Sequence, residues 1–306
     1  MKLLNLEQVD ILKHSEYHQF HLGFLLQNKN YINHIWNTFI DIEYRPQLLR
    51  LDYMANPYNW FKDMPCTIDG FIVENSWDVL RGDSNDENEK WLIDIIKTKL
   101  DENFYVKIIG DAYYIPSKIE YLKRHVTRGM YILGYDEDSF VILDSSKTEY
   151  PKLIHISFEL FKKFIRKNEY IGSKYRCEVD FYKTKMEIEH SLNLDIMKKD
   201  LEKYLTYAED TEIKTGHHAL ECATLDVEFE EKDEGIVFFL LDYRDLMYKR
   251  MVMLSQHIQI DDILERYGKI VSEWKRIFGL QDINNQGWKI LLQTEKEIMQ
   301  DLFDKL

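Results

Sequence analysis

Hydrophobic residues in the first half of the chain alternate between helical and extended spacing. From Glu87 to Glu102 they recur at intervals of three and four residues, which predicts an amphipathic helix. Phe104 to Gly110 alternates apolar and polar positions and predicts a strand directly after that helix. Met130 to Tyr135 and Phe140 to Asp144 are strand-like runs joined by four polar residues, which predicts an antiparallel hairpin. Helices mixed with antiparallel strands indicate an α+β fold.

From about residue 190 the spacing becomes almost wholly helical. Apolar stripes with i, i+3, i+4, i+7 spacing lie within residues 194–205, 263–278 and 288–303. We interpret them as core faces, because helices in proteins are stabilised mainly by packing an apolar face. No Pro-rich or Ser-rich linker separates the halves, so the change of pattern places the boundary. We expect one domain over residues 1–185 and a C-terminal helical bundle over residues 186–306.

Charge and composition exclude several classes of partner. The chain has 40 Lys and Arg against 54 Asp and Glu, a formal net charge of −14. Without a long basic run, neither nucleic acid nor an anionic membrane surface is an expected partner. The longest strongly apolar run, Ile236 to Leu241, is far shorter than the ~20 residues needed to cross a bilayer, and no apolar signal core follows the N-terminus. A cytoplasmic protein is expected, with Cys66, Cys177 and Cys222 as reduced thiols.

The order of residues between Phe104 and Phe164 resembles a known family. Asp111 to Pro116 reads DAYYIP, Tyr121 to Arg128 reads YLKRHVTR, Gly134 to Asp136 reads GYD, and a strand then ends at Asp144. This series is similar to the papain-like domain of butirosin-type acyltransferases, which belong to nonribosomal peptide and other natural-product biosynthesis. Leu241 to Arg250 and the later helices are similar to the helical C-terminal part of that family. The resemblance implies a papain-like (cysteine-peptidase-like) fold with an antiparallel sheet, followed by a helical bundle.

The family chemistry implies a Cys-His-Asp triad, in which a thiolate attacks an acyl thioester and the imidazole moves the proton. The region before the early helix, His14 to His21, has no cysteine, and Arg128 stands where the triad histidine is expected. Arginine stays protonated in proteins, so Arg128 cannot be a general base. Asp144 is the remaining triad position. We expect a buried or half-buried Arg128–Asp144 ion pair; alternatively, Arg128 binds a carboxylate or the phosphate of a carrier protein's phosphopantetheine arm.

Several other residues are candidates for the missing roles. His14, His18 and His21 have spacing that shares one helix face and could hold a metal ion, but a mixed surface and cleft role is favoured and no metal is expected. His18 or His21 could supply the base, with Ser15 as a hydroxyl nucleophile, and His21 could contact substrate. His125 is a second candidate base, which a small loop shift would move toward Asp144, and its alternative is a loop histidine with a structural or exposed role. Asp111 and Tyr114 are expected on the cleft wall as substrate-binding residues, although Asp111 could equally cap a turn. Cys66 lacks a following helix, and His217 and His218 are expected at a helix start.

Two functions stand about level at this point, and a free-standing small-molecule binder is a weaker third possibility. The first is a natural-product biosynthesis protein that acts on a carrier-protein-bound acyl or aminoacyl thioester, by acyl transfer, amide formation or hydrolysis, with an altered catalytic set. The second is a non-catalytic papain-like homologue that binds a carrier protein, peptide or biosynthetic partner. Apart from the phosphopantetheine arm as a substrate carrier, no cofactor is expected. Turnover distinguishes the two functions, because fold resemblance alone does not establish chemistry.

Overall fold

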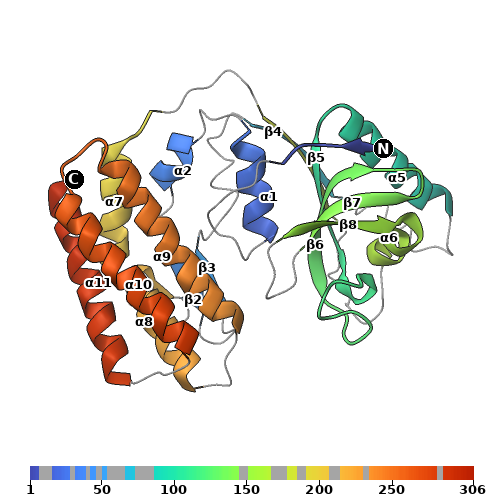
Figure 1. Cartoon of the computed structure of the whole chain (residues 1–306). Coiled ribbons are helices and arrows are strands. Elements are labelled where there is room, and N and C mark those ends of the chain that lie inside the picture. Colours follow the sequence, from blue (N-terminus) through green and yellow to red (C-terminus); the bar gives the residue numbers. More distant parts are fainter. Residues whose placement is uncertain are drawn as a thin grey trace. The chain divides into compact units, whose positions relative to one another are not determined.

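The computed structural model describes residues 1–6, 16–27, 32–38, 42–45, 50–53, 66–72, 86–144, 151–166, 178–184, 191–206, 214–229, 234–280 and 285–306. The chain divides into two compact units, Met1–Lys29 with Pro65–Ile188 and Asn30–Met64 with Glu189–Leu306. The first unit is mixed α+β with an antiparallel sheet, and the second is mainly helical (Figure 1). Among the described helices, none is long and apolar enough to cross a membrane.

The sheet of the first unit pairs its described strands antiparallel. Its order is β4 (Cys66–Ile72), β9 (Glu178–Thr184), β5 (Tyr105–Asp111), β6 (Thr127–Tyr135), β7 (Ser139–Asp144) and β8 (Lys152–Ser157), with β1 (Lys2–Leu3) also on β6. In β5–β6, Gly110 lies opposite Arg128 and Asp111 opposite Thr127. This register fixes which face of the sheet each of these side chains occupies.

The local sequence predictions for this unit are confirmed. Helix α5 (Asp86–Asp101) precedes β5, and β6 and β7 form the expected hairpin. Its turn is closed by Asp136, whose carboxylate accepts the backbone N–H of Ser139 at 2.8 Å and its hydroxyl at 2.7 Å. The hydroxyl hydrogen bond is the main reason that the pKa of Asp136 falls to about 2. Ser157 caps helix α6 (Phe158–Ile165) by accepting the N–H of Leu160.

Helices cover both faces of this sheet. On one face, Phe24 and Phe20 of α1 (Glu16–Leu25) contact Tyr105 and Tyr131, with ring centroids 5.1 and 4.7 Å apart. Alternation along β5 turns Gly110 to the other face, where the ring of Phe164 in α6 occupies the space that a Cβ would need. Figure 1 shows α1 on one side of the strands and α5 and α6 on the other. At the end of β5, the side chains of Gly110 and Asp111 therefore lie on opposite faces of the sheet, each covered by different helices.

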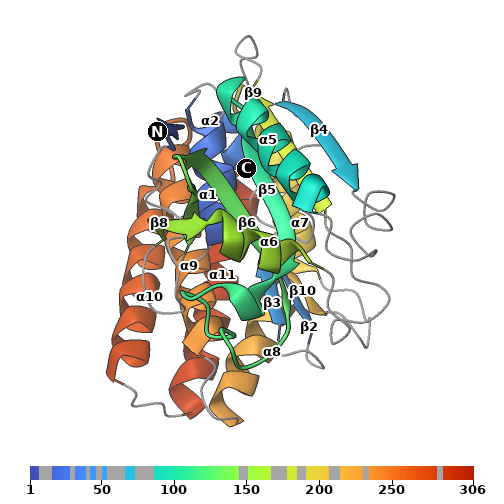
Figure 2. The same cartoon turned by 90° about the vertical axis from the view of Figure 1, so that its right-hand side faces the viewer.

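The second unit is a bundle with a small sheet. Its helices are α2 (Ile32–Thr38), α7 (Leu194–Leu205), α8 (Gly216–Phe229), α9 (Glu234–Leu254), α10 (Asp261–Leu280) and α11 (Asn285–Lys305), and its strands are β10 (Lys214–Thr215), β2 (Ile42–Arg45) and β3 (Arg50–Tyr53). Helix α10 packs against α9 and α11 (Figures 1 and 2). The predicted stripes are buried, with Trp274 and Trp288 in edge contact at 5.8 Å between ring centroids.

A buried ion pair joins α9 and α11 inside this bundle. Arg244 donates to Glu295 at 3.1 and 3.0 Å and to the carbonyl of Leu240, and both charged side chains are fully buried. Tyr267 also donates to Glu295, and the Arg244 guanidinium lies 4.0 Å from the ring centroid of Trp274. Several partners therefore compensate each charge for its removal from water.

The compact units are not two continuous stretches of chain. Residues 30–64, which the sequence pattern groups with the N-terminal domain, belong to the helical unit. They contribute α2, which packs on α7, and β2 and β3, which pack on α8 and α9. These contacts join residues more than a hundred positions apart, and local periodicity does not report them.

Candidate functional site

Asp111 and His125 form a closely paired carboxylate and imidazole at the edge of the sheet. Asp111 ends β5 and is fully buried, and its Oδ1 accepts the N–H of Tyr113 at 3.1 Å, which caps the short helix η3 (Ala112–Tyr114). Its Oδ2 lies 2.7 Å from Nδ1 of His125. The ring of His125 stacks on Tyr113 with centroids 4.0 Å apart, and 18% of the histidine side chain is exposed. The imidazole is thus fixed in place and still reaches solvent.

The carboxylate determines which imidazole nitrogen can act as a base. An ionised Asp111 accepts hydrogen bonds only, so it holds a proton on Nδ1 of His125. In the neutral ring, Nε2 then carries the basic lone pair. A carboxylate that sets the tautomer and orientation of a histidine in this way is the arrangement used in general-base catalysis.

Tyr114 lies beside the same pair. Its ring centroid is 6.2 Å from that of His125 and 5.0 Å from that of Tyr113. Burial raises the pKa of Tyr114, and the negative charge of Asp111 raises it further. The phenol therefore stays protonated, and can donate a hydrogen bond, over a wider range than an exposed tyrosine. The structure brings together three of the residues selected from the sequence, Asp111, Tyr114 and His125. The carboxylate beside His125 is that of Asp111, and not that of Asp144 as the sequence reasoning supposed, because Asp144 is paired with Lys118.

The expected Arg128–Asp144 ion pair is wrong. Arg128 donates to Glu120 at 3.0 Å, and Asp144 is paired with Lys118. The Arg128 side chain is 48% exposed, whereas those of Glu120, Asp144 and Lys118 are largely buried. Each member of the expected pair is therefore bound instead to a residue of the loop between β5 and β6, Asp144 to Lys118 and Arg128 to Glu120.

Strand alternation explains why these groups separate from Asp111. Because Gly110 lies opposite Arg128, the Arg128 side chain is on the face covered by α5 and α6. Asp144 lies on that face too, because it is four residues along β7 from Phe140, whose ring contacts Phe161 of α6. Asp111 alternates to the face on which α1 packs. The predicted common cleft wall is therefore divided between two faces of the sheet.

Glu120 is a site residue that the sequence analysis missed. It is 2% exposed and accepts hydrogen bonds from Arg128 and, at 3.3 Å, from Arg124. Burial acts to raise the pKa of Glu120, but the hydrogen bonds from Arg128, from its own backbone and from Arg124 outweigh it and lower the pKa. Helical spacing could not have indicated this contact, because residues 120–126 form turns and irregular chain and Arg128 lies in β6.

The histidines of the early helix occupy a different environment. His21 is 1% exposed and packs edge-on against Phe20, Tyr131 and Tyr182, so it lies in the aromatic core rather than beside Asp111. His18 belongs to α1, but its side chain is outside the described part of the chain, as are His14 and Ser15.

Helix α1 runs toward the edge of the sheet that holds Asp111. Phe24, near its end, contacts Tyr105 at the start of β5. Phe20, one turn earlier, is closest to Tyr131, which lies opposite Lys107 further along β5. The N-terminus of α1 is thus directed along β5 toward Asp111, on the same face of the sheet.

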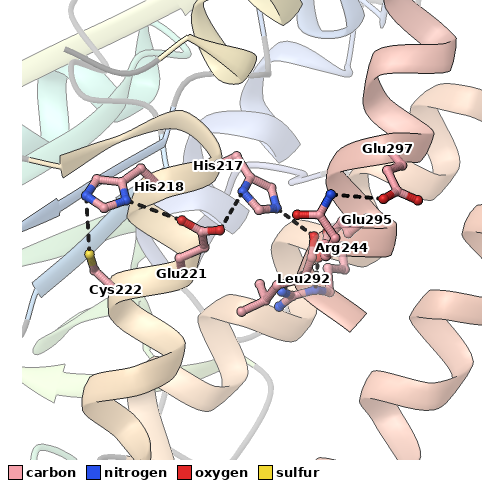
Figure 3. A network of polar contacts seen from close by, with 9 residues as sticks. His217, His218, Glu221, Cys222, Arg244, Leu292, Glu295 and Glu297 are labelled. Atoms are coloured by element: carbon pink, nitrogen blue, oxygen red, sulfur yellow. Dashed lines mark hydrogen bonds and ion pairs between the residues drawn. The ribbon is translucent and has the colours of Figure 1, made fainter. Parts of the chain in front are cut away.

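A second polar network lies in the helical unit (Figure 3). Nε2 of His217 donates to the carbonyl of Leu292 at 2.9 Å, and Nδ1 is 3.5 Å from Glu221. The other oxygen of Glu221 is 3.3 Å from Nδ1 of His218, whose Nε2 lies 3.7 Å from Sγ of Cys222. Burial lowers the pKa of His217, against the raising effect of nearby glutamates. As the sequence predicted, the two histidines stand at a helix start.

No protein-family model matches this chain, and no curated protein is significantly similar to it. What defines the protein at this level is an antiparallel α+β unit with an Asp-His pair at one sheet edge, together with a helical unit. Its function is therefore argued from the site.

Proposed function

We propose that this protein acts in natural-product biosynthesis on a carrier-protein-bound acyl or aminoacyl thioester, with His125 as the general base and Asp111 as its orienting carboxylate. The 2.7 Å contact between Nδ1 of His125 and Asp111 carries this proposal. The resemblance of residues 104–164 to papain-like butirosin-type acyltransferase domains supplies the substrate class. The direction of α1 is compatible with this site, because its N-terminus runs along β5 toward Asp111 on the same face of the sheet.

The proposed step needs no nucleophile from the protein. Nε2 of His125 takes a proton from an acceptor amine or a water as its nitrogen or oxygen attacks the thioester carbonyl. The new bond to the carbonyl carbon forms, the C–S bond breaks, and the departing thiolate receives the proton from the imidazolium. Asp111 stabilises the imidazolium between these steps, and the Tyr114 phenol is a hydrogen-bond donor for the carbonyl oxygen as charge develops there.

Two exposed cations, one in the loop before β6 and one near the start of β6, suit a carrier-bound substrate. Arg124 and Arg128 are 63% and 48% exposed at the side chain, and both lie on the buried carboxylate of Glu120. A guanidinium is a preferred partner for a phosphate group because it donates in a planar fork. We assign the phosphate of a phosphopantetheine arm to this pair of arginines.

A second function is favoured by a different observation. The Lys118–Asp144 pair is buried, with side chains 11% and 3% exposed, and it occupies the position where the resemblance expects a titrating triad. A closed ion pair there supports a non-catalytic homologue that binds a carrier protein, peptide or biosynthetic partner. This second function predicts binding of the thioester without turnover.

The test uses the full chain with small synthetic acyl and aminoacyl thioesters and a panel of acceptor amines. Product and free thiol are measured by chromatography, and binding is measured separately by calorimetry. We expect His125→Ala to abolish turnover while thioester binding stays within about threefold, and Asp111→Asn to lower turnover about 10⁴-fold, because it favours the wrong tautomer.

The chain contains its own matched control. His155 also pairs with an aspartate, Asp136, at 3.0 Å, but at the hairpin turn and with a 56% exposed side chain. His155→Ala should leave turnover unchanged. Equal losses in the His125 and His155 variants would contradict the proposed base, and binding without turnover in the unmodified protein would establish the second function.

A further inference from the structure

Cys222, His218 and Glu221 form a nucleophile, base and carboxylate series on one helix of the second unit (Figure 3). Their spacing of three and four residues places them on the same face of α8. Sγ of Cys222 is 3.7 Å from Nε2 of His218, and Nδ1 of His218 is 3.3 Å from Glu221. This set shares no residue with the Asp111–His125 site.

A buried group anchors the series. Glu221 lies between two histidines, and the inner one, His217, is 2% exposed and donates to the Leu292 carbonyl of α11. The hydrogen bond to α11 fixes the His217 ring, and this ring in turn helps to hold the Glu221 carboxylate in place. A fixed Glu221 keeps a proton on Nδ1 of His218 and turns the lone pair of Nε2 toward the thiol of Cys222.

We propose that Cys222 is a reactive thiol that exchanges with small-molecule disulfides, with His218 as its base and Glu221 as the group that orients His218. An imidazole within reach converts a thiol to the thiolate that reacts. Cys222 and His218 are both partly exposed, so a small disulfide reaches them. This site is independent of the function proposed for the first unit.

The position of Cys222 within the helix selects the chemistry. Cys222 is inside α8, where backbone N–H groups are used in hydrogen bonds four residues back. Acyl transfer needs free donors for the developing oxyanion, and a helix interior does not supply them from its backbone. Disulfide exchange develops no oxyanion and needs only the thiolate and access.

The exchange balances without a further reactant. The Cys222 thiolate attacks one sulfur of the disulfide, a new S–S bond forms, and the original S–S bond breaks. The departing thiolate takes the proton held by the His218 imidazolium. Cys222 is oxidised to a mixed disulfide and the released thiol is the reduced product.

The experiment isolates this thiol in the full chain. Cys66→Ala with Cys177→Ala leaves Cys222 as the remaining cysteine of three, and an aromatic disulfide that releases a coloured thiolate reports the rate against pH. We expect the half-maximal rate at least about one pH unit below 8.5, the usual value for a free thiol. Intact mass should show one mixed disulfide with cystamine or glutathione disulfide, and none in the matching Cys222→Ser variant.

Two substitutions test the roles of the neighbours. His218→Gln should return the half-maximal pH to about 8.5 and slow the reaction at pH 7 about threefold, because the loss of thiolate is partly offset by higher intrinsic nucleophilicity. Glu221→Gln should give a half-maximal pH between that of the protein with His218 and Glu221 intact and that of His218→Gln. A half-maximal pH near 8.5 before any change to His218 overturns the proposal, and this measurement stands even where a variant fails to fold. A profile unaffected by His218→Gln overturns it equally.

Discussion

Two ion pairs on the same face of the sheet should differ greatly in their contribution to stability. Both side chains of the Lys118–Asp144 pair are largely buried, whereas in the Arg128–Glu120 pair the arginine side chain is 48% exposed. Lys118→Met keeps most of the aliphatic stem but leaves the Asp144 carboxylate without its cation. Arg128→Met is the matched control, since Arg124 still reaches Glu120.

The magnitude follows from burial. Removing one partner of a buried pair costs about 3–5 kcal/mol. The loss cannot exceed about 4 kcal/mol by much, because at that point the stranded carboxylate takes up a proton instead, and protonating an ordinary aspartate at pH 7 costs about 4 kcal/mol. We therefore expect Lys118→Met to lower the free energy of unfolding of the first unit by about 3–4 kcal/mol. Arg128→Met should cost under about 1 kcal/mol, because solvent screens an exposed pair.

Amide hydrogen exchange by mass spectrometry measures this for one unit at a time. Peptides from β6 and β7 should exchange about 100-fold faster or more in Lys118→Met and under about fivefold faster in Arg128→Met. Peptides from α10 and α11 report the other unit and should not change. Replacing both members of the buried pair, Lys118→Met with Asp144→Leu, should recover most of the loss. Equal effects of the two methionine variants would refute the reasoning.

Three further predictions concern packing and charge. Gly110→Ala should destabilise the first unit by about 1–3 kcal/mol, because its Cβ would fall 2.2 Å from the Phe164 ring; thermal unfolding checks this, and Phe164→Leu in the same chain should relieve part of the loss. Glu295→Gln should cost the helical unit about 3–5 kcal/mol by leaving the charge of Arg244 buried without its counterion, read from exchange in α10 and α11. Burial lowers the pKa of His217 from 6.5, so the stability that the neutral ring provides is complete above pH 6.5 and is lost as pH falls through the folded-state pKa. Urea unfolding should therefore give a lower free energy of unfolding at pH 5.5 than at pH 7.5, and the difference should be smaller in His217→Gln.

Elements defined by neighbouring residues were predictable from the sequence. The helix at Asp86–Asp101 and the hairpin closed by Asp136 depend on periodicity and turn chemistry within about sixteen residues. The pairing of β4 with β9 joins residues more than a hundred positions apart, and the inclusion of residues 30–64 in the helical unit is equally distant. Tertiary packing decides such contacts, and single-sequence patterns carry little information on them.

The candidate site shows the same division between local and distant effects. Asp111 and Tyr114 were selected as cleft-wall residues and His125 as the imidazole nearest in sequence to Arg128, and the short segment between them brings all three together. The partner of Arg128 was wrong because it depends on the course of the loop between β5 and β6. That loop brings Lys118 to Asp144 and Glu120 to Arg128, and neither approach follows from strand alternation alone.

The ion pairs at the expected triad position have a consequence for the Asp-His pair on the other face. The Lys118–Asp144 and Arg128–Glu120 ion pairs join the segment between Asp111 and His125 to the sheet. Within this segment, the N–H of Leu122 donates to the carbonyl of Tyr113. Leu122 has a φ of 52°, a left-handed conformation that costs a non-glycine residue about 1 kcal/mol or more. Such a conformation persists only where the surroundings determine it. The buried Lys118–Asp144 pair thus holds the loop in the shape that delivers His125 to Asp111, so charge on one face of the sheet fixes the geometry of the proposed base on the other.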